Sequence, residues 1–100
     1  MPPPLRFRGL EPAEILGRAV PVATTRRSRL LGLALLRRER AGEGLLIPGC
    51  RSVHTFGMRF PLDLLFLDER SRVIELRREL PPRRIARCSA AAAVLELPSP

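Results

Sequence analysis

The chain has 100 residues and a formal net charge of +8 at pH 7, and all 18 of its basic residues are arginine. This length predicts a single domain over residues 1–100 with a modest core, and the proline-rich ends at 1–4 and 98–100 are expected to be frayed. No apolar signal segment opens the chain and no run approaches the ~18 apolar residues of a membrane span, which excludes a membrane protein and predicts a cytoplasmic one.

The first half of the chain predicts one strand and one short helix. The segment Gly17–Thr25 is rich in small and β-branched residues, which indicates a strand, and Pro21 places that strand at a sheet edge. Over Arg26–Leu36 apolar side chains recur at helical spacing. We therefore expect a short helix that is capped by Thr24 or Thr25 and weakened by an internal glycine.

Short apolar or alternating segments, separated by turn residues, fill the second half of the chain. We expect strands at Leu45–Pro48, Arg51–Phe56, Leu62–Glu69, Val73–Leu80 and Ala91–Pro98, with a polar turn at Asp68–Arg72. The last segment also fits a marginal alanine helix, but Val94, Leu95 and Leu97 favour a strand. Many short strands with one helix indicate a mostly β (α+β) domain, built as a small barrel-like or rolled antiparallel sheet.

Two motifs make a family resemblance specific. In CRSVHTFGMRFPLDLLFLDERSRVIEL, residues 50–76, a histidine-containing strand leads through Met58 and a Pro-hydrophobe-Asp step into a hydrophobic strand. Upstream, TTRRSRLLGL contains Arg-x-x-Gly-Leu, with Arg29, Gly32 and Leu33 at the motif positions. Over about residues 18–98 the chain resembles the bacterial and archaeal family known as domain of unknown function 192. The resemblance implies a compact, mostly β fold with a short helix, and no agreed activity, substrate or cofactor.

The end of the chain departs from the family pattern. The family continues past LEL-P with a glycine-led turn and a further strand, whereas this chain stops at Pro100. A missing strand would leave an open sheet edge. We therefore expect self-association through that edge, unless the chain is a truncated variant.

The candidate site lies around the turn between the strands expected at 51–56 and 62–69. A hairpin around residues 57–61 would bring His54 close to Asp63. A histidine, threonine, methionine, arginine and aspartate gathered at one turn on a rigid β scaffold describe a small polar pocket. The site residues that we expect are His54, Thr55, Met58, Arg59 and Asp63, with Arg29 as a neighbour. We expect this pocket to bind a small anionic ligand that Arg59 holds and His54 orients.

The same residues allow an enzyme or a purely structural role. A hydrolase-type enzyme would orient His54 through Asp63 and would take its nucleophile from Thr55, Ser52 or Cys50. Four residues of extended strand separate the Cα atoms of Cys50 and His54 by ~13 Å, which is too far for a nucleophile and its base. In the structural interpretation, Asp63 accepts hydrogen bonds from backbone N–H groups and the nearby methionine fills the core.

The two cysteines suggest a metal site or a disulfide only weakly. A zinc site built from Cys50, His54, Asp63 and Cys88 would lack any CxxC or HxxxH pair, so we expect neither a metal nor a cofactor. A disulfide between Cys50 and Cys88 is possible, but a reducing cytosol favours two thiols.

A further alternative uses the arginine surface. Arginine pairs occur at 26–27, 37–38, 77–78 and 83–84, and such charge attracts nucleic acid or an acidic protein. Only 4 aromatic residues, all Phe, are available for stacking, and no zinc-finger, helix-turn-helix or RRM signature occurs. Because the absence of Lys, Asn and Tyr is typical of GC-rich coding, the charge alone is weak evidence. The alternative is a basic accessory domain with weak nucleic-acid or protein binding.

Overall fold

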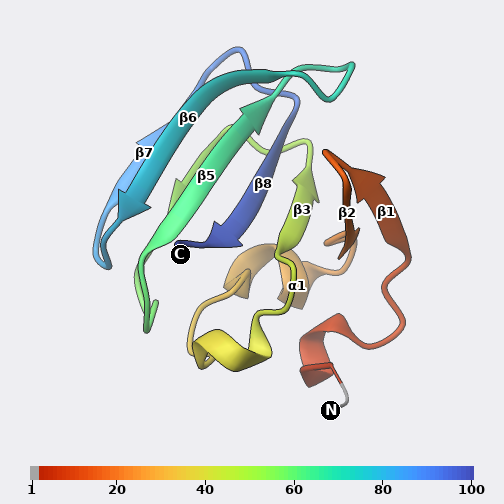
Figure 1. Ribbon diagram of the computed structural model, residues 1–100, viewed down its shortest axis with the longest axis vertical. Helices are drawn as coiled ribbons and strands as arrows, with labels where there is room; N and C mark the ends of the chain where they lie inside the picture. Colours follow the sequence, from red (N-terminus) through yellow and green to blue (C-terminus); the bar gives the residue numbers. More distant parts are fainter. Residues whose placement is uncertain (1–2) are drawn as a thin grey trace.

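The computed structural model describes residues 3–100, and residues 1–2 of the end expected to be frayed lie outside the described part. The described chain forms short strands, one α-helix and two 3-10 helices (Figure 1). The strands are β1 (Pro12–Ile15), β2 (Arg18–Pro21), β3 (Leu45–Pro48), β4 (Ser52–His54), β5 (Leu62–Leu67), β6 (Val73–Leu80), β7 (Ile85–Arg87) and β8 (Ala93–Pro98). The helices are η1 (Leu5–Phe7), α1 (Arg26–Leu31) and η2 (Arg38–Arg40). No helix within residues 3–100 has the length and apolar character needed to cross a membrane.

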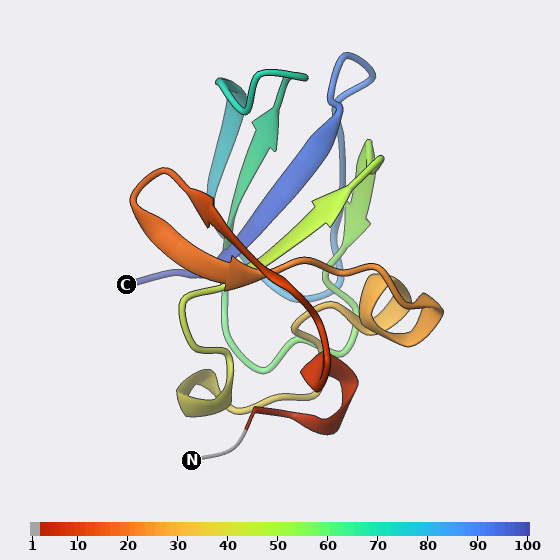
Figure 2. The same cartoon turned by 90° about the vertical axis from the view of Figure 1, so that its right-hand side faces the viewer.

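Four strands form the main sheet, in the order β3-β8-β5-β6, and all neighbours in it are antiparallel. Two antiparallel pairs, β1 with β2 and β4 with β7, complete the strands. The β1–β2 hairpin is linked to the main sheet by a parallel bridge between Val22 and Leu46. The sheets curve around the core without closing into a barrel (Figures 1 and 2), so the mostly β, rolled antiparallel fold is confirmed.

Two apolar cores lie on opposite faces of the main sheet. The larger core packs that sheet against the segment that follows α1 and against β4 and β7, and Phe66 and Leu33 are fully buried in it. The smaller core lies under the β1–β2 hairpin, which crosses the sheet in Figure 2, and joins Ile15 and Val20 to Leu95. Because each fully buried side chain of this size contributes roughly 1.5–3 kcal/mol, these two cores supply most of the stability.

Helix α1 begins where the sequence predicts and ends earlier. Thr25 caps it, since Thr25 Oγ1 accepts a hydrogen bond from Ser28 N at 3.1 Å and Ser28 Oγ accepts one from Thr25 N at 3.2 Å. The helix stops at Gly32, which has a φ of 52° and a ψ of −127°, a conformation that favours glycine. Leu33 and the residues after it therefore leave the helix and enter the larger core.

The hairpin expected between the strands around His54 and Asp63 does not form, and that prediction is wrong. β4 pairs with β7, while β5 pairs with β6 and β8. The reason is burial: nearly every side chain of β5 is buried, so this strand requires a neighbour on each edge and a covering layer on each face. β7 was missed because it follows a Pro-Pro-Arg-Arg break, and β1 because it begins at a proline and has only 4 residues.

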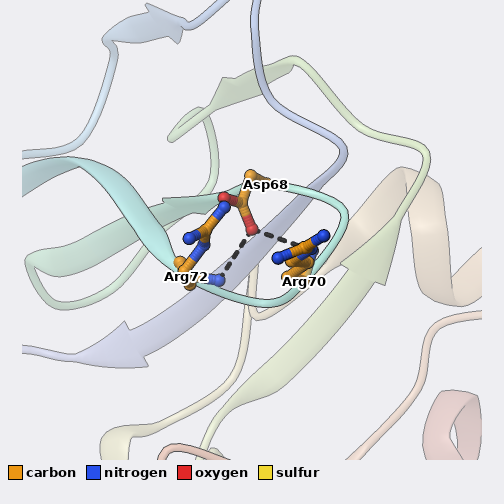
Figure 3. A network of polar contacts seen from close by, with 3 residues as sticks. All are labelled: Asp68, Arg70 and Arg72. Atoms are coloured by element: carbon orange, nitrogen blue, oxygen red, sulfur yellow. Dashed lines mark hydrogen bonds and ion pairs between the residues drawn. The ribbon is translucent and has the colours of Figure 1, made fainter.

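The β5–β6 turn is the polar turn expected at 68–72, and Figure 3 shows its hydrogen bonds. Asp68 Oδ1 accepts hydrogen bonds from Arg70 N at 2.8 Å and Arg72 N at 2.9 Å, and Asp68 Oδ2 accepts one from Arg72 Nε at 2.9 Å. The backbone bond from Arg72 is the main cause that lowers the pKa of Asp68. An aspartate at the end of β5 thus builds the turn from its own neighbours in sequence.

The outer edge of β6 carries no partner strand within the described residues. This strand bears Arg77 and Arg78, and the register shifts opposite Asp63, where Glu79 has a φ of 53°. Charged side chains and irregular pairing discourage an edge from joining another chain. Self-association through an open edge stays a prediction.

Candidate functional site

The residues predicted to share one site are separated into three environments. Arg59 lines an open groove, which we call the arginine groove. Arg29, His54 and Met58 line a second, smaller hollow, which we call the Glu96 cavity. The remaining two, Thr55 and Asp63, are buried and line neither hollow.

The arginine groove lies among η1, α1 and η2, the helices that gather at one end of the molecule in Figures 1 and 2. Its volume is about 670 Å³. Its lining residues are Pro4, Leu5, Arg6, Arg27, Leu31, Leu35, Leu36, Arg37, Glu39, Arg40 and Arg59. Arginines from four separate segments therefore meet one acidic side chain and several leucines.

The arginines of this groove differ in how they are held. Arg6 is fixed, because its Nη1 donates to Gly32 O at 2.9 Å and to Ala34 O at 2.7 Å. Burial, and after it the nearby charge of Arg27, lowers the pKa of Arg6. In contrast, the exposed side chains of Arg27, Arg37 and Arg59 make no hydrogen bond or ion pair within residues 3–100. Three guanidinium groups are thus available to a ligand.

The Glu96 cavity lies between α1, β3, β4 and β8 and has a volume of about 50 Å³. Its lining residues are Arg29, Leu30, Leu31, Gly32, Ile47, Cys50, Ser52, Val53, His54, Met58 and Glu96. Most of these side chains are apolar, and the carboxyl group of Glu96 is the acidic group in the lining.

Glu96 is 4% exposed, and its surroundings leave half of its carboxyl group without a protein donor. Oε1 accepts a hydrogen bond from Leu33 N at 3.3 Å, whereas Oε2 accepts none from the described residues. Burial raises the pKa of Glu96 from its ordinary value of 4.5 to about 7, against the lowering effect of the Leu33 N–H. Gly32 makes this arrangement possible, since a Cβ at that position would lie 2.6 Å from Glu96 Oε1.

The rim of the Glu96 cavity carries the polar side chains of Arg29, Cys50, Ser52 and His54. Arg29 Nη1 donates to Pro48 O at 2.5 Å, which ties α1 to the end of β3. Cys50 Sγ donates to Ser52 O at 3.2 Å, and burial raises the pKa of this thiol. His54 is exposed, and its ring centroid lies 5.9 Å from that of Phe56. The Arg-x-x-Gly-Leu motif is therefore a structural unit that positions α1 against β3 and Glu96.

Thr55 and Asp63 hold the chain together at two other places. Thr55 Oγ1 donates to Pro81 O at 2.7 Å and accepts from Arg84 N at 2.8 Å, which fixes the loop before β7. Asp63 Oδ1 accepts from Glu79 N at 2.9 Å and from Ser99 Oγ at 2.6 Å. Ser99 is buried, so the expected fraying at 98–100 does not hold for this residue.

The positions of the potential metal-ligating side chains do not support a metal site. Within residues 3–100, no group of three or more His, Cys, Asp or Glu side chains is placed to hold a metal ion. Cys50 and Cys88 are free thiols.

Glu96 and most of the arginine groove are not predicted from the sequence. Glu96 has a recognisable signal, because it is the one acidic residue in the apolar segment Ala91–Pro98, where a strand is expected. The convergence of Arg6, Arg27 and Arg37 with Arg59 has no local signal, because these residues come from separate segments of the chain.

Fold and hollows together describe a small, mostly β domain of a family without an assigned activity. The chain belongs to the family of domain of unknown function 192, DUF192, described as "Uncharacterized ACR", whose model matches residues 11–99. The resemblance seen in the sequence is thus confirmed and extends towards the N-terminus. A comparison with curated proteins finds no match.

Two solved structures have a similar fold. One is a Sinorhizobium meliloti 1021 protein named as "a putative transcription regulator", which is 23% identical to this chain and superposes with a TM-score of 0.71. The match covers 90% of this chain and 78% of that protein's chain. The other is a protein of unknown function from Novosphingobium aromaticivorans DSM 12444, which is 17% identical and superposes with a TM-score of 0.64. The match covers 99% of this chain and 89% of that protein's chain. At these identities the similarity shows the fold alone.

Proposed function

We propose that this domain binds a small anionic ligand in the arginine groove. The observation that carries the proposal is that Arg27, Arg37 and Arg59 line one groove and are not engaged by described acidic side chains. A guanidinium group presents a planar fork of N–H donors that matches the oxygens of a carboxylate or a phosphate. Several such forks around one hollow favour an anion with more than one oxygen.

Size and lining also fit a small molecule. A volume of about 670 Å³ falls within the range of small-molecule sites. Leu31, Leu35 and Leu36 offer apolar contact to the part of the ligand that carries no charge. Glu39 offsets part of the positive charge of the groove, so binding is expected to be selective among anions.

The proposal keeps Arg59 as an anchor and changes its neighbours. His54, Met58 and Arg29, which the sequence analysis groups with Arg59, line the Glu96 cavity instead. The groove arginines Arg27 and Arg37 take their place as partners of the anion.

Calorimetric titration with inorganic phosphate and with pyrophosphate tests the proposal. Arg59→Ala is expected to weaken binding about tenfold or more, because a hydrogen bond to a charged group contributes roughly 1.5–3 kcal/mol. Arg70→Ala is the matched control, since Arg70 is exposed and outside the groove, and it should leave the affinity unchanged. Equal weakening by both variants, or no binding by the wild type, contradicts the proposal.

Nucleic-acid binding is a second candidate, favoured by the net charge of +8 and by the printed name of the Sinorhizobium meliloti protein. Salt distinguishes the two candidates. Binding of short DNA or RNA should weaken steeply between about 50 and about 200 mM salt, because many counterions are released. A small anion in a groove makes few ionic contacts and should lose much less. A steep loss with oligonucleotides, and no response to pyrophosphate, would favour the nucleic-acid candidate.

A further inference from the structure

Glu96 is a buried acid that has no cationic partner among residues 3–100, although the chain has 18 basic residues. Buried carboxylates are ordinarily paired with a positive charge or satisfied by several donors. For Glu96, the pKa responds to burial and to the Leu33 N–H, and no arginine contributes to it. Even Arg29, which lines the same cavity, directs its Nη1 to Pro48 O instead. The fold therefore maintains, on a side chain that is 4% exposed, an acceptor oxygen that residues 3–100 do not satisfy.

The cavity gives this acceptor an open side. Glu96 lines it, and Oε2 is the oxygen that receives no hydrogen bond from the described residues. Leu31, Ile47, Val53 and Met58 supply apolar walls. A volume of about 50 Å³ holds a group of a few heavy atoms, because a cavity needs only about 10–15 Å³ of such volume to hold one water molecule.

We propose that the Glu96 cavity binds a primary ammonium group on a short alkyl chain. The ammonium group supplies hydrogen-bond donors to Glu96 Oε2 together with the positive charge that the buried carboxylate lacks. The alkyl carbons contact the apolar walls. A quaternary ammonium ion has no N–H donor and is excluded, and a metal ion finds too few ligands among the described residues.

The other polar groups around Glu96 shape which amines enter. They are Arg29 on α1, Cys50 in the loop after β3, and Ser52 and His54 on β4. The positive charge of Arg29 at the rim repels a second ammonium group, so the cavity selects monoamines over diamines. The Cys50 thiol has a raised pKa and remains uncharged at neutral pH. Amine binding should strengthen from pH 6 to pH 8, since Glu96 must release its proton to accept the cation.

An NMR titration with ethylammonium chloride at pH 8 tests this proposal on the full chain. We expect saturable shifts at the backbone N–H groups of Gly32 and Leu33, in the millimolar range that suits so small a ligand. Tetramethylammonium chloride and sodium chloride should give no saturable shift at these residues. Saturable shifts with tetramethylammonium, or only linear shifts with ethylammonium, would overturn the proposal.

Two variants complete the test. Glu96→Gln keeps the shape of the side chain and removes its charge, and it should weaken ethylammonium binding about tenfold or more. Glu43→Gln is the matched control, because Glu43 is exposed and pairs with Arg18 outside this cavity. Each variant is first checked for a native spectrum. Retention of full affinity in folded Glu96→Gln overturns the proposal, while Arg59→Ala should not affect it, since the proposal does not depend on the arginine groove.

Discussion

The two hollows treat charge in opposite ways. The arginine groove holds several positive charges that are exposed or partly exposed, whereas the Glu96 cavity holds one carboxyl group that is 4% exposed and whose pKa burial raises. Water screens the arginines, so a groove of them costs the fold little. Glu96 is only 4% exposed, so water screens it far less, and the chain accommodates it through Gly32 and the amide of Leu33.

Gly32→Ala should produce the largest effect on stability. The new Cβ would lie 2.6 Å from Glu96 Oε1, and alanine would have to adopt a φ of 52°. Backbone strain and overpacking together predict a loss of roughly 2–4 kcal/mol in the free energy of unfolding. Chemical denaturation measures it.

Gly42→Ala is the matched control for that change, because Gly42 has a φ of 61° and nothing lies within 4 Å of its added Cβ. It should cost about 1 kcal/mol from backbone strain alone. If both variants lose the same free energy, contact with Glu96 contributes nothing and the contrast between the two hollows is weakened.

Glu96→Gln should remove a pH dependence that the wild type shows. The folded protein keeps the Glu96 proton up to a pKa of about 7, whereas the unfolded chain releases it near 4.5. The free energy of unfolding therefore falls as pH rises from 4.5 through 7, by about 3 kcal/mol in total. Denaturation between pH 5 and pH 8 measures the slope. A wild type as flat as the variant would mean that Glu96 is ionised throughout.

Local signals explain what the sequence predicts correctly. The Thr25 cap of α1 and the apolar runs of β5 and β8 are each recognisable within a few neighbouring residues, so elements and fold class follow from them. The partner of a strand is not a local property. The alternating pattern of β4 around His54 is equally compatible with pairing to β5 or to β7. Because β5 is buried and has β6 and β8 as its two neighbours, β4 pairs with β7.

The site is harder to predict because it depends on long-range contact. Leu33 and Glu96 are 63 residues apart in sequence and meet only after β8 inserts between β3 and β5. The Arg-x-x-Gly-Leu motif is recognisable in the sequence, but its role in accommodating Glu96 is visible only in the folded structure, where Gly32 and Leu33 contact the Glu96 carboxyl group. The isolated acid in an apolar strand is the one feature that sequence analysis alone should have followed.

Asp68→Asn should have the smallest effect on stability. It tests how an acid in a solvated turn differs from the buried Glu96. Asp68 is an acid like Glu96, but it lies in a solvated turn and is satisfied by Arg70 N, Arg72 N and Arg72 Nε. Asparagine can still accept the two backbone bonds at Oδ1, so the melting temperature at pH 7 should fall by much less than in Gly32→Ala.

The pH response of Asp68 should also have the opposite sign to that of Glu96. Its hydrogen bonds lower its pKa below 3.8, so its contribution is present above that value and is lost as pH falls through the lowered pKa. Acid unfolding followed by circular dichroism should begin at slightly higher pH in wild type than in Asp68→Asn, once both curves are aligned at neutral pH. If Asp68→Asn instead changed the slope between pH 5 and pH 8, the assignment of that slope to Glu96 would fail, because Asp68, whose pKa is lowered below 3.8, does not titrate in that range.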